Sequence, residues 1–179
     1  TMRKALAAPT YTLAKLTAEA DELRRIAFAL DNAPADRAAL LAQPLTWASA
    51  TVLAHLRDPV PAQWLQKRNA AELKLYVSGL LFNPAADVAI NQVLDAASPM
   101  IDAYQLPQLI ARSCSATQPA KVLQRIAAAK DPNAREGLNQ AVKTAAHCAE
   151  QRKRWRADLI TVGSGARPTR TTGSCGNCR

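Results

Sequence analysis

The sequence predicts an all-α fold, a single compact helical bundle of about 7–9 short helices with a long C-terminal helix and a flexible basic tail. Hydrophobic residues make up 49% of the chain but aromatic residues only 4%, and a core of Ala, Leu, Val and Ile suits packed helices better than sheets. Apolar positions recur at steps of three and four, typical of helices. We therefore divide the 179 residues into a lead-in segment (1–11), one helical domain (12–162) and a tail (163–179).

The first helix is predicted from Thr12 to about Asp31. Its apolar residues recur at helical spacing, at Leu13, Leu16, Ala20, Leu23, Ala27 and Leu30. These positions form one stripe along a helix, and the charged residues lie mostly off it. We expect this stripe to face the core.

Proline punctuates the rest of the domain. Pro34 begins a second helix, and Pro44 precedes a third that ends before Pro59, because proline cannot continue a helix but fits the first turn of the next one. Later segments with helical periodicity are 70–81, 85–97, 101–113 and 120–130. The prolines between them are irregularly spaced, which favours a single bundle over a solenoid of fixed period.

The last helix is predicted from Asp131 to about Val162. Asp131 can cap it and Pro132 fits its first position. Apolar residues continue at roughly helical spacing, at Leu138, Val142, Ala145, Ala149, Trp155, Leu159 and Val162. The tail beyond has too little apolar surface to fold alone, so we expect it to be flexible.

The net charge of +9 lies entirely at the C-terminal end. Residues 1–111 contain ten Lys and Arg and ten Asp and Glu, whereas residues 112–179 contain thirteen basic and four acidic residues. A neutral body with a basic end indicates a polyanionic partner. Nucleic acid is the favoured partner, ahead of an anionic membrane surface or an acidic protein.

The predicted nucleic-acid-binding residues are cations of the last helix and the tail. They are Arg135, Lys143, Arg152, Lys153, Arg154, Arg156, Arg167 and Arg170. The four between 152 and 156 occupy little more than one helical turn, so some of them must be exposed. The alternative is a solvated helix end whose cations complement the helix dipole. Because the positive charge continues into the tail, we favour binding.

Trp155 lies within this cationic cluster and has two interpretations. It could stack on an unpaired base, but its spacing to Leu159 and Val162 favours packing. No RNA-recognition sheet or helix-turn-helix fits the sequence, and phosphate contacts carry no base information. We therefore expect largely sequence-independent binding.

The four cysteines allow three interpretations. Cys175 and Cys178 form a CxxC pair, a spacing at which two thiolates can hold one zinc ion, and Cys148 could supply a third ligand, with Cys114 in reserve. The pair could instead form a disulfide or be redox-active. The third possibility is that the thiols are exposed and have no special role. We predict no cofactor, with zinc as the one that these cysteines could hold.

Catalytic motifs are missing from the sequence. It has two histidines, no recognisable nucleophile motif, and six glycines of which four lie in the tail, so no phosphate-binding loop can be placed. We predict a protein that is not an enzyme.

Membrane and secretion signals are also missing. No run approaches the ~18–20 apolar residues of a membrane span, and the apolar stretch near the N-terminus is too short for a secretory signal. We expect the protein in the cytoplasm or within a nucleoprotein particle, not secreted through a signal peptide.

Together these features predict a non-enzymatic nucleic-acid-binding protein. One form of it is a coat or nucleocapsid subunit that assembles into a homo-oligomer with RNA or DNA. The alternatives are a helical adaptor or regulator that docks an acidic partner protein, and a thiol- or zinc-dependent factor.

Overall fold

The structure is a computed structural model that describes residues 13–163, with side chains described for 22–159. The described residues form nine α-helices and one 3₁₀ turn, and they contain no strand. The predicted all-α class is therefore confirmed. The predicted lead-in over 1–11 and nearly all of the predicted tail lie outside the described residues.

The helices follow the predicted segments closely. They are α2 (Leu13–Asp31), α3 (Pro34–Leu41), α4 (Trp47–Ala54), α5 (Ala62–Gln66), α6 (Ala70–Phe82), α7 (Asp87–Ala97), η1 (Ser98–Met100), α8 (Gln105–Arg112), α9 (Ala120–Ala128) and α10 (Pro132–Gly163). Pro34 and Pro132 begin helices as predicted. Pro84 instead lies in a turn before α7, and Pro99 lies in a single 3₁₀ turn.

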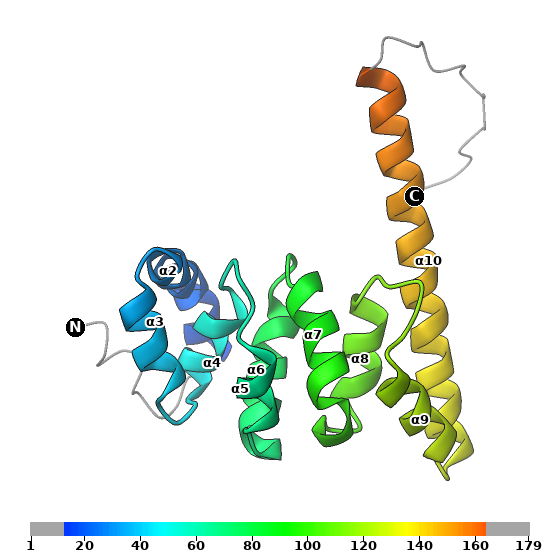
Figure 1. The fold of residues 1–179 in the computed structure, drawn as a ribbon, viewed down its shortest axis with the longest axis horizontal. Coiled ribbons are helices and arrows are strands. Elements are labelled where there is room, and N and C mark those ends of the chain that lie inside the picture. The colour runs from blue at the N-terminus through cyan, green and yellow to red at the C-terminus, as the bar shows by residue number, and fades with distance from the viewer. Residues whose placement is uncertain (1–12, 164–179) are drawn as a thin grey trace.

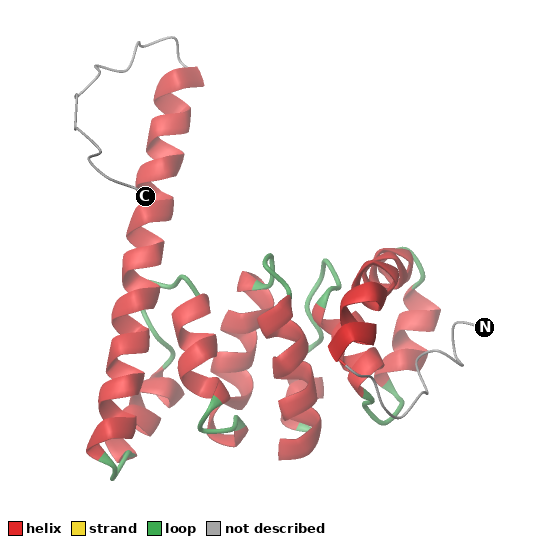
Figure 2. Ribbon diagram, turned by 180° about the vertical axis from the view of Figure 1, so that it is seen from behind, coloured by secondary structure: helices red, strands yellow, loops and turns green. Residues whose placement is uncertain are grey.

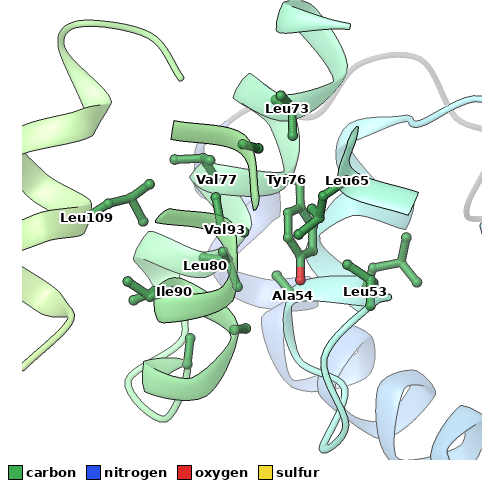
Figure 3. Close-up of a cluster of buried hydrophobic side chains, with 14 of the residues drawn as sticks. Leu53, Ala54, Leu65, Leu73, Tyr76, Val77, Leu80, Ile90, Val93 and Leu109 are labelled. Carbon is green, nitrogen blue, oxygen red and sulfur yellow. The ribbon is translucent and has the colours of Figure 1, made fainter. Parts of the chain in front are cut away.

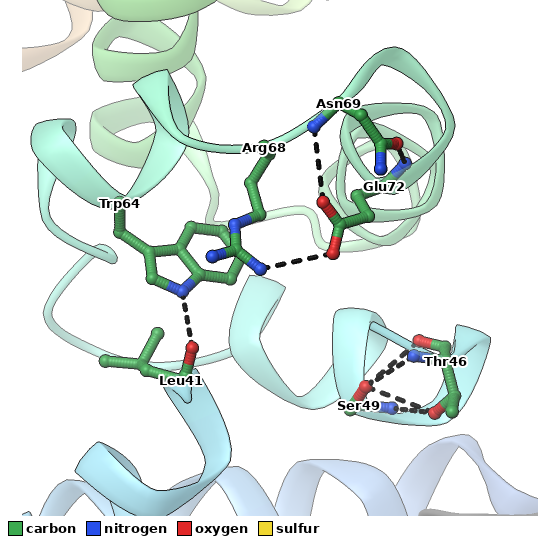
Figure 4. Close-up of polar contacts among 7 residues, drawn as sticks. All are labelled: Leu41, Thr46, Ser49, Trp64, Arg68, Asn69 and Glu72. Carbon is green, nitrogen blue, oxygen red and sulfur yellow. Dashed lines mark hydrogen bonds and ion pairs between the residues drawn. The ribbon is translucent and has the colours of Figure 1, made fainter. Parts of the chain in front are cut away.

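Side chains fix the start of two central helices. At α4, the Thr46 hydroxyl accepts a hydrogen bond from Ser49 N (3.2 Å), and Ser49 Oγ accepts one from Thr46 N (2.8 Å). At α6, Asn69 and Glu72 make the same reciprocal pair at 2.9 and 3.2 Å (Figure 4). Such capping boxes satisfy donors that the first helical turn leaves free.

The helices form two rows. Within each row the helices follow one another along the long axis of the molecule (Figures 1 and 2). In one row α2 packs on α4, α4 on α6, α6 on α8, and α8 on α10; in the other α5 packs on α7 and α7 on α9. The bundle thus has an internal order that the irregular proline spacing did not indicate. Each helix packs mainly on helices close to it in the chain.

The core lies between the two rows and is mostly aliphatic, as the composition predicted. Its largest fully buried side chains come mainly from the five helices α4 to α8. They include Leu94 and, shown in Figure 3, Leu53, Leu65, Leu73, Tyr76, Leu80, Ile90 and Leu109. Helices α4 and α6 pack closely at Gly79, where a Cβ would lie 2.9 Å from Ala54 Cβ and 3.1 Å from Ala50 O. A glycine therefore permits this contact.

Side chains join the C-terminal ends of α4, α6 and α8, which are neighbours in the first row. Asn83, which follows α6, donates a hydrogen bond to the last carbonyl of α4 at Ala54 (2.8 Å). Arg112, at the end of α8, donates to Asn83 O (2.7 Å) and to Leu81 O. These contacts satisfy carbonyls that helix ends leave free. They define one edge of the stack, formed by the ends of α4, α6 and α8 and the start of α7.

Candidate nucleic-acid interface

Helix α10 begins where the sequence predicted. The carboxylate of Asp131 accepts hydrogen bonds from Asn133 N (3.1 Å) and Ala134 N (3.3 Å), and Pro132 occupies the first position. From there the helix continues for 32 residues, about 48 Å at 1.5 Å per residue. It is much longer than α8, the eight-residue helix on which it packs.

The first half of α10 packs on α8 and α9. We call residues 132–150 the packed half. One side of it is buried, with Leu138 7% exposed, Ala141 6% and Ala145 0%. This part of the predicted apolar stripe therefore faces the core.

The second half leaves the stack. From Gln151 to Leu159 every side chain is exposed, and the ribbon of α10 continues past the edge of the other helices (Figures 1 and 2). We call residues 151–163 the projecting half, which is about 20 Å long. Between Gln151 and Leu159 the whole circumference of the helix is accessible to a partner.

A disulfide and an ion pair hold α10 in place close to the point where it leaves the body. A disulfide joins Cys114, after α8, to Cys148, with a Cα–Cα distance of 5.0 Å, well within the range for disulfides. One turn further on, the Arg152 guanidinium forms an ion pair with the Asp87 carboxylate at the start of α7. The direction of the projecting half is therefore set by contacts with two other segments.

The predicted binding residues separate into groups. Lys153, Arg154 and Arg156, which we call the projecting cations, are exposed and make no ion pair within the described residues. Arg152 is paired with Asp87. Lys143 is exposed on the packed half. The cluster predicted around residue 154 therefore exists as an exposed patch, with one member held by the body.

Arg135 has a structural role that the sequence did not indicate. Its Nε and Nη2 atoms donate hydrogen bonds to Ala129 O at 3.1 and 2.5 Å, so it satisfies the end of α9. It also lies 19 residues before Arg154, about 28 Å along the helix. Arg135 is therefore remote from the projecting cations. The predicted binding residues Arg167 and Arg170 lie outside the described residues.

Trp155 does not pack within the described chain. Its side chain is 72% exposed, and Leu159 is 60% exposed. The packing interpretation of Trp155 is therefore wrong for the single chain. The same two residues continue the helical apolar spacing, but no other helix of residues 13–163 lies beside them to cover them.

Trp64 shows what a structural tryptophan looks like in this protein. It is buried, its Nε1 donates to Leu41 O (2.8 Å; Figure 4), and its ring meets Tyr76 edge-on at 5.8 Å. The guanidinium carbon of Arg68 lies 4.8 Å from the ring centroid. No contact of these kinds is found for Trp155 within the described residues.

The structure gives Cys148 a partner other than the zinc ion that was predicted for it. The residues that the structure describes include no group of three or more side chains able to hold a metal ion. In the disulfide Cys148 has no thiolate, so this bond and the predicted role of Cys148 as a zinc ligand exclude each other. Cys175 and Cys178 lie outside the described residues. The partnership of Cys114 with Cys148 was missed, although Cys148 follows the buried Ala145 by three residues and so lies near the packed face.

His55 is positioned as a packing residue rather than as a base. It ends α4, and its Nδ1 lies 2.8 Å from Thr51 O. Burial lowers the pKa of His55 below its ordinary value.

In the described range, no helix is long and apolar enough to cross a membrane.

No protein family, curated protein or solved structure matches the chain. Its function is therefore inferred from its residues and their geometry.

Proposed function

We propose that this protein is a non-enzymatic nucleic-acid-binding protein that contacts phosphates through the projecting half of α10. The observation that carries the proposal is the placement of the projecting cations. They lie on a helix segment that leaves the body and is exposed all round. A phosphate backbone can approach such a segment without displacing any part of the fold.

Electrostatics favours a polyanion at this position. Like charges this close repel one another, and an anionic partner replaces that repulsion with attraction and releases condensed counterions. Each cation that neutralises a phosphate adds about 0.7 to 0.9 to the slope of log affinity against log salt. The projecting cations should therefore contribute about 2 to 3 to that slope.

The helix dipole does not account for these cations. Dipole effects are confined to about the last turn of a helix, and α10 has no basic residue in its last turn. Arg156 lies seven residues before the last helical residue, Gly163. A purely structural explanation of the cluster is therefore weaker than the sequence alone suggested.

The test is to replace all three projecting cations with Ala in the full chain. Binding of labelled oligonucleotides of unrelated sequence is measured by fluorescence anisotropy over a range of salt concentrations. Affinity should fall for every sequence, and the salt slope should decrease by about 1 for each cation removed. Unfolding should be unaffected, because these side chains are exposed.

The matched control removes three exposed lysines elsewhere, with the same change in net charge. These are Lys67, Lys121 and Lys130, replaced together with Ala. If only the total charge mattered, both triple variants would bind equally weakly. That result, or the absence of salt-dependent binding by the native protein, would overturn the proposal. Binding of an acidic protein alone would instead favour the adaptor.

A self-assembling coat or nucleocapsid subunit is a particular form of this function. It is supported by exposed large apolar side chains along the body, including Phe28, Phe82, Val88 and Tyr104, which could form contacts between copies. Light scattering after size-exclusion chromatography, with the 260/280 nm absorbance ratio, tests this form. A large species that dissociates with nuclease or salt is expected. A monomer that binds nucleic acid one to one would support the binding function and contradict the coat form.

A further inference from the structure

We infer that the nucleic acid bound by the projecting half is single-stranded, with an unpaired base stacked on the indole of Trp155. The inference rests on the proposed function and adds the class of nucleic acid to it. It applies to RNA and DNA alike, because every base offers an aromatic face.

The first step is the exposure of Trp155. A tryptophan with 72% of its surface in water has no packing role in the described chain, unlike the buried and hydrogen-bonded Trp64. Large aromatic side chains that are exposed beside cations are typical of surfaces that bind single strands. Trp155 lies directly between Arg154 and Arg156 in the sequence.

The second step is the arrangement around the helix. At 100° per residue, Trp155 and Leu159 lie about 40° apart and form one apolar strip. Arg152 and Arg156 lie beside that strip, about 6 Å apart along the helix axis. A base on Trp155 would therefore have Arg152 on its flank. Arg156 lies about 100° round the helix from Trp155, where it can bind a phosphate of the same strand.

The third step is that the binding position beside Trp155 is partly preformed. Gln151, Arg152 and Trp155 line a shallow depression. Asp87 holds Arg152, and Gln151 Nε2 lies 2.8 Å from His147 Nε2. Two of the three lining side chains are thus restrained by neighbours, which reduces the entropy lost when a ligand is bound there.

A duplex fits this arrangement less well than a single strand does. In a duplex the base faces are already stacked on one another, so an indole on the helix surface can reach only base edges and the backbone. A second copy of the chain does not fit either, because the same cluster of cations would meet itself. A single strand satisfies the indole and the cations together.

The experiment compares Trp155→Ala, Trp155→Phe and native full-length protein. The probes are one labelled oligonucleotide, as RNA and as DNA, each free and annealed to its complement. Native protein should bind the single strands more tightly than the duplexes. Trp155→Ala should weaken single-strand binding by about 5- to 150-fold, the usual range for one stacked base, and leave duplex affinity and salt slope unchanged. Trp155→Phe should retain most of the native affinity.

Fluorescence supplies a second measurement that does not depend on affinity. Trp155 is exposed, whereas Trp64 is buried and Trp47 half-buried, so the difference between native and Trp155→Phe emission isolates Trp155. Single strands should quench that difference signal, and duplexes should not.

The outcomes separate this inference from the proposed function. Salt-dependent binding with equal affinity for single strands and duplexes, unaltered by Trp155→Ala, overturns the single-strand inference and leaves the proposed function in place. Equal losses for both forms in Trp155→Ala also overturn it. No salt-dependent binding of any probe overturns both.

Discussion

The two halves of α10 belong to one continuous helix but have opposite surroundings. Both carry apolar residues at helical spacing, yet Leu138 in the packed half is 7% exposed and Leu159 in the projecting half is 60% exposed. The packed half contributes to the core. The projecting half presents its apolar and cationic side chains to solvent.

The difference arises from the lengths of neighbouring helices. Helix α8 has eight residues and α9 has nine, against 32 in α10, so the neighbours end while α10 continues. Apolar periodicity shows which face of a helix can be buried. Whether that face is buried depends on what lies beside it.

Removing the disulfide should have the largest effect, because it secures the end of the packed half. For cysteines separated by 34 residues, loop-closure entropy gives about 4 kcal/mol of stabilisation. The double variant Cys114→Ser/Cys148→Ser should lose about that much unfolding free energy in urea. Reductant should produce the same loss in native protein.

The chain provides a matched control in its second cysteine pair. Cys175→Ser/Cys178→Ser removes two sulfurs from the tail and should leave the unfolding free energy almost unchanged. Stability that is insensitive to reductant would show that Cys114 and Cys148 are not bonded in solution.

Shortening a leucine in each half tests the comparison directly. Leu138→Ala removes buried methyl groups from the packed half and should cost about 2 to 4 kcal/mol. Leu159→Ala makes the same chemical change where the side chain is exposed and should change stability by less than about 0.5 kcal/mol. Denaturant unfolding measures both. Equal losses would mean that the projecting half is covered in solution, for example by another copy.

The ion pair at the boundary should have the smallest effect. Arg152→Gln breaks the pair with Asp87, which is partly exposed to water, so the loss should be below about 1 kcal/mol. Lys153→Gln removes a neighbouring charge that has no ion pair in the described structure, and serves as the control. Hydrogen exchange in the projecting half should be faster in Arg152→Gln alone. Equal exchange in the two variants would show that the pair does not restrain α10.

Local features of the sequence predicted much of the fold. Proline located the starts of α3, α9 and α10, and the cap predicted for α10, Asp131, is the cap that the structure has. The exposure of the projecting cations also followed from their density within one turn.

Features that depend on distant residues could not be predicted in this way. The disulfide joins segments 34 residues apart, and the ion pair of Arg152 with Asp87 joins residues 65 apart in the sequence. The exposure of Trp155 depends on where α8 and α9 end. None of these is contained in the periodicity of a single helix, which is why the sequence favoured packing for Trp155. The predicted binding role of Arg135 stays a prediction.

The two-row stack has a consequence for how the chain folds. Because each helix packs mainly on helices close to it in the sequence, little chain has to be closed into loops before contacts form, and such topologies fold fast. Neighbouring helices can associate while the chain is still being synthesised, from the N-terminal end onward. Cys148 is synthesised after α8 and after the buried residues of the packed half, Leu138, Ala141 and Ala145, so oxidation would lock an arrangement that packing has already selected.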